Sequence, residues 1–308
     1  MGSACSLTIT AADGDAAESL ALRAEATVAQ LEALWSRFRP DSELMVLDEH
    51  TGEDWGVGPD TFALIAAALE AHRRTDGLFD PTLLDALVAA GYDRSFDQLG
   101  DGVIPIAAHG DARAGAGVGP EQIGLDHERA MVMLPAGLRL DLGGIAKGRA
   151  ADVVAEQLRR RGAIGACVDL GGDIVVFGAR EVDEPWGIAV DDPQRPGDDL
   201  ALLVLEQGAV ATSSRARRRW ATTEGPAHHL IDPRTRRPAV TDLLAVTVVA
   251  AEAMWAEVFA KAVLIAGSVE GAALLDTVGL PALLVDESGT VTSVGVMESF
   301  LMDAQAPR

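Results

Sequence analysis

The sequence has no asparagine, only two lysines and only two cysteines in 308 residues. Cys5 and Cys167 cannot form a disulfide framework, which excludes a disulfide-stabilised secreted scaffold and favours free thiols in a cytoplasmic protein. No uncharged run reaches roughly 18 apolar residues, so neither a transmembrane helix nor stable membrane insertion is expected. The N-terminal residues lack a basic segment followed by an apolar run, so no signal peptide is predicted.

Positive charge is also scarce, and arginine supplies nearly all of it. The chain has 25 basic and 47 acidic residues, a net charge of −22, which excludes a nucleic-acid-binding or anionic-membrane surface. Lys147 and Lys261 are the only lysines among these basic residues. Such a bias is typical of GC-rich coding, so a retained lysine either is left over by chance or indicates a position that needs a compact ammonium.

The pattern of apolar residues predicts an α+β fold. Apolar residues make up 48% of the chain, enough for a sizeable core. Helical spacing and alternating segments follow one another, with mostly antiparallel strands in the middle. A hairpin is predicted over 131–140 and a strand over 229–231. Residues 97–121 are rich in glycine and alanine and lack a period, which indicates a flexible excursion or a hinge between lobes.

Two glycine pairs mark candidate ligand loops. In Asp141–Gly148 a strand leads through paired glycines into a helix whose first turn holds Lys147. Helix N-terminal N–H groups and a nearby ammonium attract phosphate, although a tight strand–helix connection with a surface lysine is the alternative. The segment is not a P-loop. Asp169–Asp173 is either a hairpin turn or a loop around a ligand.

Three further segments carry charged or titratable groups. His229 enters a strand beside Asp232, as a general base or as a structural histidine. Glu257 and Lys261 lie four residues apart on a helix that is apolar nearly all round, where charged groups are costly unless they meet a ligand, an ion or each other. The basic run over 215–219 is either a solvated loop, a phosphate contact or a docking patch for an acidic partner.

These segments together resemble the ApbE family of FAD:protein FMN transferases, over essentially the whole chain. The family's motifs occur here in the family's order: Met1–Ser3, Ser36–Leu44, Thr75–Pro81, Asp141–Gly148, Asp169–Asp173, Ala211–Ser213, His229–Pro233 and Ala256–Ala262. Each motif alone is weak evidence for the family, but eight motifs in the same order are specific to it.

The resemblance implies one domain over 1–308, made of two interleaved α/β lobes with an FAD cleft between them. It also implies a reaction: the FMN phosphoryl group of FAD passes to a Ser or Thr hydroxyl of an acceptor protein, AMP leaves, and Mg²⁺ assists. By the resemblance, FAD contacts fall at Met1, Phe38, Leu78, Phe79, Asp80, Asp141, Lys147 and Ile231. A Mg²⁺-binding carbonyl falls at Gly144, a carboxylate ligand at Glu257, and activation of the acceptor hydroxyl at His229.

The sequence departs from the family where the last motif holds the metal. The family has Asp and Thr in A-D-x-x-x-T-A, and here Glu257 and Lys261 stand in their places. An ammonium has only donors, so Lys261 cannot bind Mg²⁺. The hypothesis is that Lys261 takes the place of the metal, pairs with Glu257 and, with Lys147, neutralises the FAD diphosphate. A smaller departure is Asp48, where relatives often have asparagine.

Three other activities are compatible with the same residues. A chain whose metal site has degenerated would hold FAD or FMN without transferring it. An FAD pyrophosphatase would release FMN and AMP to water. An oxidoreductase would keep the flavin as a redox cofactor.

Overall fold

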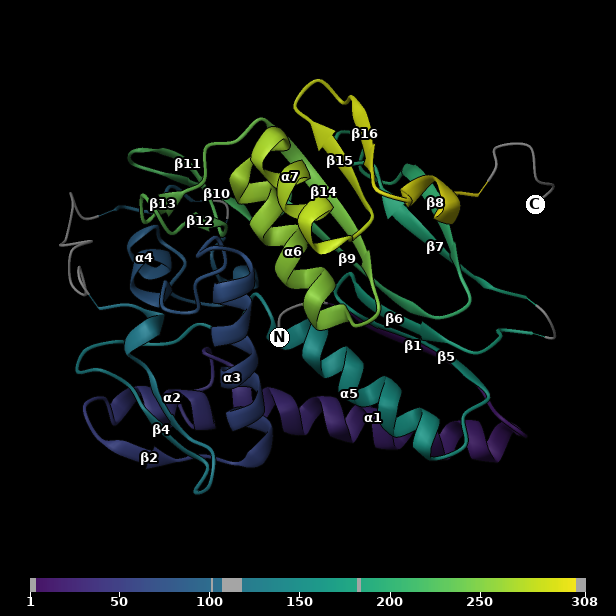
Figure 1. Cartoon of the computed structure of the whole chain (residues 1–308), viewed down its shortest axis with the longest axis horizontal. Coiled ribbons are helices and arrows are strands. Elements are labelled where there is room, and N and C mark those ends of the chain that lie inside the picture. Colours follow the sequence, from purple (N-terminus) through teal and green to yellow (C-terminus); the bar gives the residue numbers. More distant parts are fainter. Residues whose placement is uncertain (1–3, 101, 107–117, 182–183, 303–308) are drawn as a thin grey trace. The chain divides into compact units, whose positions relative to one another are not determined.

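The computed structural model describes residues 4–100, 102–106, 118–181 and 184–302. The chain forms two compact units, and each is assembled from segments that are far apart in the sequence. The first unit is built mainly from residues 30–146 and 217–240, and the second from 3–29, 147–216 and 241–308. Figure 1 colours the segments along the chain.

The second unit is organised around a seven-stranded sheet. Its strand order is β1-β5-β6-β9-β14-β15-β16, and every neighbouring pair is antiparallel. The predicted α+β fold with mostly antiparallel strands is therefore confirmed. The strands are β1 (Cys5–Thr10), β5 (Gly165–Leu170), β6 (Asp173–Phe177), β9 (Gly208–Ser214), β14 (Leu243–Ala250), β15 (Ala282–Asp286) and β16 (Val291–Val294).

Both faces of this sheet are covered. The hairpin of β7 (Trp186–Asp191) and β8 (Asp199–Leu205) packs on one face, in an apolar cluster that includes Val210 of β9. Successive strand residues point to opposite faces, so Ala209 and Ala211 face the other side, where α6 (Ala253–Ala266) crosses β9 and β14 (Figure 1). Alanines at this contact let the helix approach the sheet closely.

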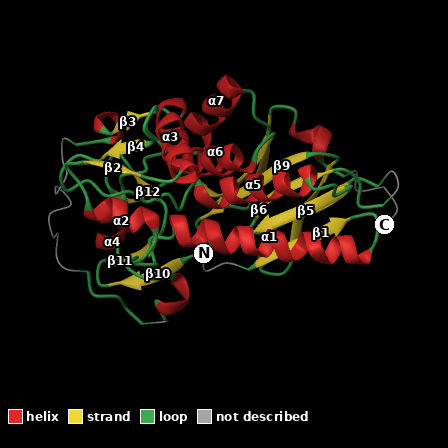
Figure 2. Cartoon of the chain, turned by 90° about the horizontal axis from the view of Figure 1, so that it is seen from below, coloured by secondary structure: helices red, strands yellow, loops and turns green. Residues whose placement is uncertain are grey.

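The remaining helices of the second unit are α5 (Ala146–Arg160) and α7 (Ser268–Val278), together with the first part of α1 (Gly14–Trp35). Helices α1 and α5 lie side by side, as Figures 1 and 2 show, and the Thr27 hydroxyl donates to Gln157 Oε1 over 2.8 Å. Gly162, at φ +90°, lies just beyond the end of α5. No helix in the described parts of the chain has both the length and the apolar character needed to cross a bilayer.

The first unit holds shorter elements. Its helices are α2 (Glu43–Glu49), α3 (Pro59–Arg74) and α4 (Leu84–Ala89), with 3₁₀ turns at Phe96–Gln98 and Pro120–Gln122. A small antiparallel sheet has the order β2-β4-β3, and two hairpins follow, β10–β11 and β12–β13. The strands are β2 (Asp54–Gly56), β3 (Gly124–Asp126), β4 (Met131–Met133), β10 (Arg219–Thr222), β11 (Gly225–His228), β12 (Ile231–Asp232) and β13 (Arg237–Pro238).

Two predicted strands are wrong in detail. β4 pairs with β2 and β3 instead of with residues 138–140, because the Leu140 N–H is bonded to the side chain of Asp48. The strand predicted over 229–231 is interrupted, since β11 ends at His228 and β12 begins at Ile231. Of the predicted excursion over 97–121, residues 101 and 107–117 lie outside the described part of the chain.

Candidate active site

A buried group of three charges lies at the start of α5. The Lys147 ammonium is bonded to the Asp173 carboxylate and lies 2.5 Å from Glu257 Oε1. Asp173 and Glu257 are 3% and 4% exposed, and the Lys147 side chain is 14% exposed. The structure therefore brings together two predicted site residues, Lys147 and Glu257, and adds Asp173, the last residue of the segment predicted to be a hairpin turn or a ligand loop.

The N-termini of α5 and α6 hold one another in place. Glu257, from α6, accepts a 2.9 Å bond from the Gly148 N–H in the first turn of α5. Asp152, from α5, accepts bonds of 2.7 and 3.0 Å from the Ala253 and Met254 N–H groups that open α6. A Cβ on Gly148 would lie 2.5 Å from the Ala253 carbonyl oxygen, so only glycine permits this approach. Each carboxylate thus satisfies N–H groups that would otherwise lack partners at the other helix's first turn.

The charge state of Lys147 follows from its neighbours. Burial alone lowers the pKa of an ammonium, but the carboxylates of Asp173 and Glu257 outweigh it, so the pKa of Lys147 lies above its usual value. Lys147 is therefore a permanent cation at neutral pH. Two of its three N–H donors serve the carboxylates, and among the described contacts the third remains for an acceptor such as a phosphate oxygen.

The predicted phosphate loop is held by bonds within the first unit. Asp141 Oδ1 accepts a 2.8 Å bond from the Gly143 N–H, and the Asp141 N–H donates to the Pro81 carbonyl over 2.8 Å. Asp80, predicted to contact FAD, accepts from the N–H and the hydroxyl of Thr82. The segments Thr75–Pro81 and Asp141–Gly144 are therefore joined within one unit, as neighbouring parts of one ligand surface would be.

Arg37 is a residue that the sequence analysis passed over. Its guanidinium stacks on the rings of Phe38 and Tyr92, at 4.3 and 4.5 Å, and donates to the Tyr92 carbonyl. Its Nε lies 3.9 Å from Asp141 Oδ2, and its Nη2 is buried without a hydrogen-bond partner among the described residues. Its only signal in the sequence is its place inside the Ser36–Leu44 motif.

Asp48 holds the residue that precedes the Asp141–Gly144 loop. Its Oδ1 accepts a 2.9 Å bond from the Leu140 N–H, just before Asp141. Its Oδ2 is buried with no hydrogen-bond partner in the described residues. Burial raises the pKa of Asp48 from 3.8 to about 7, against the lowering effects of the Leu140 N–H and Arg139; Asp141 and Asp85 raise it further.

We expect Asp48→Asn to remove a pH-dependent loss of stability. Between pH 3.8 and about 7 folded Asp48 keeps a proton that the unfolded chain has lost, so its contribution to stability falls as pH rises through this window. Asparagine carries no charge at any pH. Urea unfolding should find the variant more stable than wild type at pH 8 by on the order of 2–4 kcal/mol, and nearly equal to it at pH 4. Asp54→Asn, at an exposed strand position, is the control, and a constant difference between Asp48→Asn and wild type across this range would contradict the expectation.

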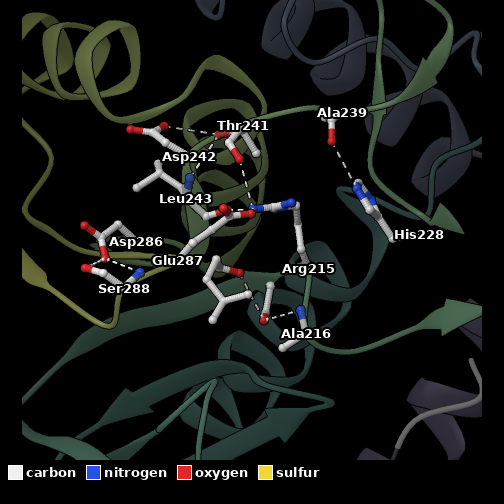
Figure 3. Close-up of polar contacts among 12 residues, drawn as sticks. Arg215, Ala216, His228, Ala239, Thr241, Asp242, Leu243, Asp286, Glu287 and Ser288 are labelled. Carbon is white, nitrogen blue, oxygen red and sulfur yellow. Dashed lines mark hydrogen bonds and ion pairs between the residues drawn. The ribbon is translucent and has the colours of Figure 1, made fainter. Parts of the chain in front are cut away.

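The two adjacent histidines have different environments. His228 Nδ1 accepts from the Leu230 N–H at 3.3 Å, so Nε2 carries the proton and donates to the Ala239 carbonyl at 3.1 Å (Figure 3). His228 is thus a structural histidine that fixes the bend after β11. His229 lies in that bend and is half-buried. The sequence pattern did not distinguish the two, because the bend, and not strand alternation, sets their directions.

The basic run divides between structural and surface positions. Arg215 donates to the Leu243 and Thr241 carbonyls, at 2.7 and 2.9 Å, and to Glu287 at 2.7 Å (Figure 3). It therefore ties the end of β9 to neighbouring segments of its own unit. The predicted phosphate contact or docking patch does not fit Arg215, whose donors serve the fold.

The other predicted FAD contacts differ in accessibility. The Phe38 side chain is 36% exposed, so its ring is open to a planar ligand. Leu78 and Phe79 are buried, and Ile231 packs in a buried cluster with Tyr92 and Trp220, so these three side chains are not exposed to a ligand. Met1 lies outside the described residues.

The residues around Glu257 do not fit a magnesium ion. Both Glu257 oxygens already accept bonds, from an ammonium and from a backbone N–H. Lys261, one turn further along α6, offers donors only. No group of three acidic, histidine or cysteine side chains in the described parts of the chain is arranged to hold a metal. Mg²⁺ requires near-octahedral oxygen ligands, which these side chains do not supply.

Comparison with known proteins identifies the family. A sequence profile of the ApbE family matches residues 1–284. The chain belongs to the ApbE family. The FAD:protein FMN transferase of Treponema pallidum is 31% identical to this ApbE-family chain over 286 residues, covering 87% of this chain and 78% of the relative. That of Vibrio cholerae is 29% identical over 253 residues, covering 81% and 74%.

Solved structures agree with the assignment. The ApbE protein of Thermotoga maritima has a TM-score of 0.86 and 25% identity, with 98% of this chain and 97% of that chain covered. The flavinyl transferase ApbE of Pseudomonas stutzeri has a TM-score of 0.83 and 26% identity, with 98% and 95% covered. The similarity extends over nearly the whole of both chains, so this ApbE-family chain has the family's complete fold.

Proposed function

We propose that this chain is an FAD:protein FMN transferase, which moves the FMN part of FAD to a Ser or Thr hydroxyl of an acceptor protein. The observation that carries the proposal is the Lys147 ammonium in the first turn of α5, three residues after the Gly143–Gly144 pair. A fixed cation at the positive end of a helix dipole suits the diphosphate of FAD. Membership in a family whose relatives bear this name supports the assignment.

The reaction is a phosphoryl transfer in which positions and charges do most of the work. The acceptor hydroxyl oxygen forms a bond to the phosphorus atom of the FMN half. The bond from that phosphorus to the bridging oxygen breaks, and AMP leaves with the electron pair. Lys147 would bind a phosphate oxygen through its remaining N–H donor, at the positive end of the α5 dipole, and the half-buried His229 would accept the hydroxyl proton.

The other predicted contacts have supporting roles. The exposed Phe38 ring is suited to stack on the flavin or the adenine. Asp80 and Asp141 would hold their loops in place for the ligand, since each carboxylate caps N–H groups of its own loop. We place the protein in the cytoplasm, because neither Cys5 nor Cys167 forms a disulfide in the described part of the chain. Burial raises the pKa of Cys167 to about 11, which keeps that thiol unreactive.

The test is AMP release. The purified chain is mixed with FAD, with and without a Ser- or Thr-bearing acceptor domain, and AMP, FMN and covalent flavin are quantified by chromatography. We expect AMP and flavinylated acceptor in equal amounts, and only when the acceptor is present. AMP with free FMN in its absence would indicate a pyrophosphatase. FAD held tightly, with no AMP in the presence of several acceptors, would indicate a flavin-binding protein.

A further inference from the structure

The carboxylate of Glu257 already has a cation. Lys147 Nζ lies 2.5 Å from Glu257 Oε1 and is also bonded to Asp173, while Glu257 Oε2 accepts from the Gly148 N–H. These partners come from α5 and β6, more than eighty residues from Glu257 in the sequence, so the packing of the second unit holds them together.

Electrostatics opposes a second cation at the same place. A divalent ion bound to Glu257 would lie within a few ångströms of a permanently charged ammonium. At that separation the repulsion is several kcal/mol even with an effective dielectric constant of about 20. Lys261 lies four residues after Glu257, on the same side of α6, and adds further positive charge.

The buried group already contains a cation without a metal. Asp173 and Glu257 carry two negative charges, and Lys147 places one positive charge between them. In a sequence that otherwise uses arginine for its positive charges, a lysine stands at this position. An ammonium is more compact than a guanidinium and fits between two carboxylates as a point charge.

We propose that this chain carries its own cation in place of a divalent metal: the Lys147 ammonium, held between Asp173 and Glu257, excludes Mg²⁺ from Glu257. It follows, if the chain is the transferase proposed above, that phosphoryl transfer here does not depend on a metal at Glu257. This differs from the hypothesis drawn from the sequence, in which Lys261 was the replacing cation and the partner of Glu257.

Metal binding provides a test that does not depend on activity. Mn²⁺, which can be followed by its electron paramagnetic resonance signal, is titrated into the full chain with and without FAD, and Mg²⁺ effects are followed by thermal unfolding. We expect no Mn²⁺ site that depends on Glu257 and no stabilisation by Mg²⁺. An occupied site at a thousandfold excess over its Kd would instead stabilise the protein by about 4 kcal/mol. Mn²⁺ binding that Glu257→Gln abolishes would overturn the proposal.

The converse variant removes the ammonium. Lys147→Met leaves two carboxylates without their cation, and we expect it to gain an Mn²⁺ site that is lost again in Lys147→Met/Glu257→Gln. A folded Lys147→Met that binds no Mn²⁺ would also overturn the proposal. If Lys147→Met does not fold, the comparison of Mn²⁺ binding to wild type and to Glu257→Gln still tests the proposal.

Measuring AMP release provides a second test. AMP release from FAD in the presence of acceptor should be the same in EDTA as in Mg²⁺, and release in Mg²⁺ alone would overturn the proposal. No AMP in either condition would contradict the proposed function and leave the metal titrations valid. The two proposals can therefore fail independently.

Discussion

Replacing His229 by alanine is expected to lower the rate of AMP release by about 10²–10⁴-fold, while FAD binding remains close to wild type. The reason is that a general base acts on the acceptor hydroxyl and not on FAD. His229 is half-buried at the bend between β11 and β12, next to a histidine whose own bonds are internal. Single-turnover AMP release and flavin fluorescence titration measure the two quantities separately.

Two matched variants control this experiment. His127→Ala removes an exposed histidine in the turn between β3 and β4, away from the bend, and should leave AMP release unchanged. His228→Ala removes the bond to the Ala239 carbonyl, so it should lower the free energy of unfolding by about 1–3 kcal/mol. Equal rates for His229→Ala and wild type would exclude His229 as the base.

The second large effect is expected from Lys147→Met, through stability. Removing the ammonium leaves Asp173 and Glu257 as adjacent buried carboxylates, and loss of one partner from a buried ion pair costs about 3–5 kcal/mol. Burial and mutual repulsion then raise the pKa of both acids in the folded state. Their contribution to stability falls as pH rises through these raised values, so the loss should be larger at pH 8 than at pH 5. Urea unfolding at the two pH values measures it.

A neutral replacement of the whole group is the control. The variant Lys147→Met/Asp173→Asn/Glu257→Gln keeps similar volumes and removes all three charges, so it should recover much of the lost stability. It should also lose the pH dependence of the single variant. A single variant as stable as wild type at pH 8 would show that solvent reaches the group and compensates the carboxylates.

The bonds between α5 and α6 connect the stability of the Lys147 group to FAD binding. Glu257 and Asp152 each cap the other helix, so the position of the α5 N-terminus depends on the α6 carboxylate. A change in the Lys147 group therefore moves the N-terminus of α5, where phosphate is proposed to bind. Stability and FAD affinity should fall together in Lys147→Met, whereas His229→Ala should change neither.

Much of the site could be predicted from local sequence. The strand–glycine–helix pattern around Gly143–Gly144 placed Lys147 in the first turn of a helix, and α5 begins at Ala146. The apolar surroundings of Glu257 predicted a buried charge, and it is buried. These features depend on the spacing of residues within one helix or loop, and this spacing can be read from the sequence.

The partners of the buried charges could not be predicted in this way. Spacing on α6 predicts a pairing of Glu257 with Lys261, but it gave no sign of the bonds that Glu257 accepts from Lys147 and Gly148. Arg37 and Asp48 likewise bond to Tyr92 and Leu140, which are distant in sequence.

The sequence by itself thus determined the element types, the apolar faces, the acidic charge and the family's ordered motifs, because each follows from residue identity and local period. Only the tertiary structure decided which carboxylate meets which ammonium. The free energy of a buried charge depends on groups brought close by packing, and the close approach of α5 to α6 at Gly148 selects them.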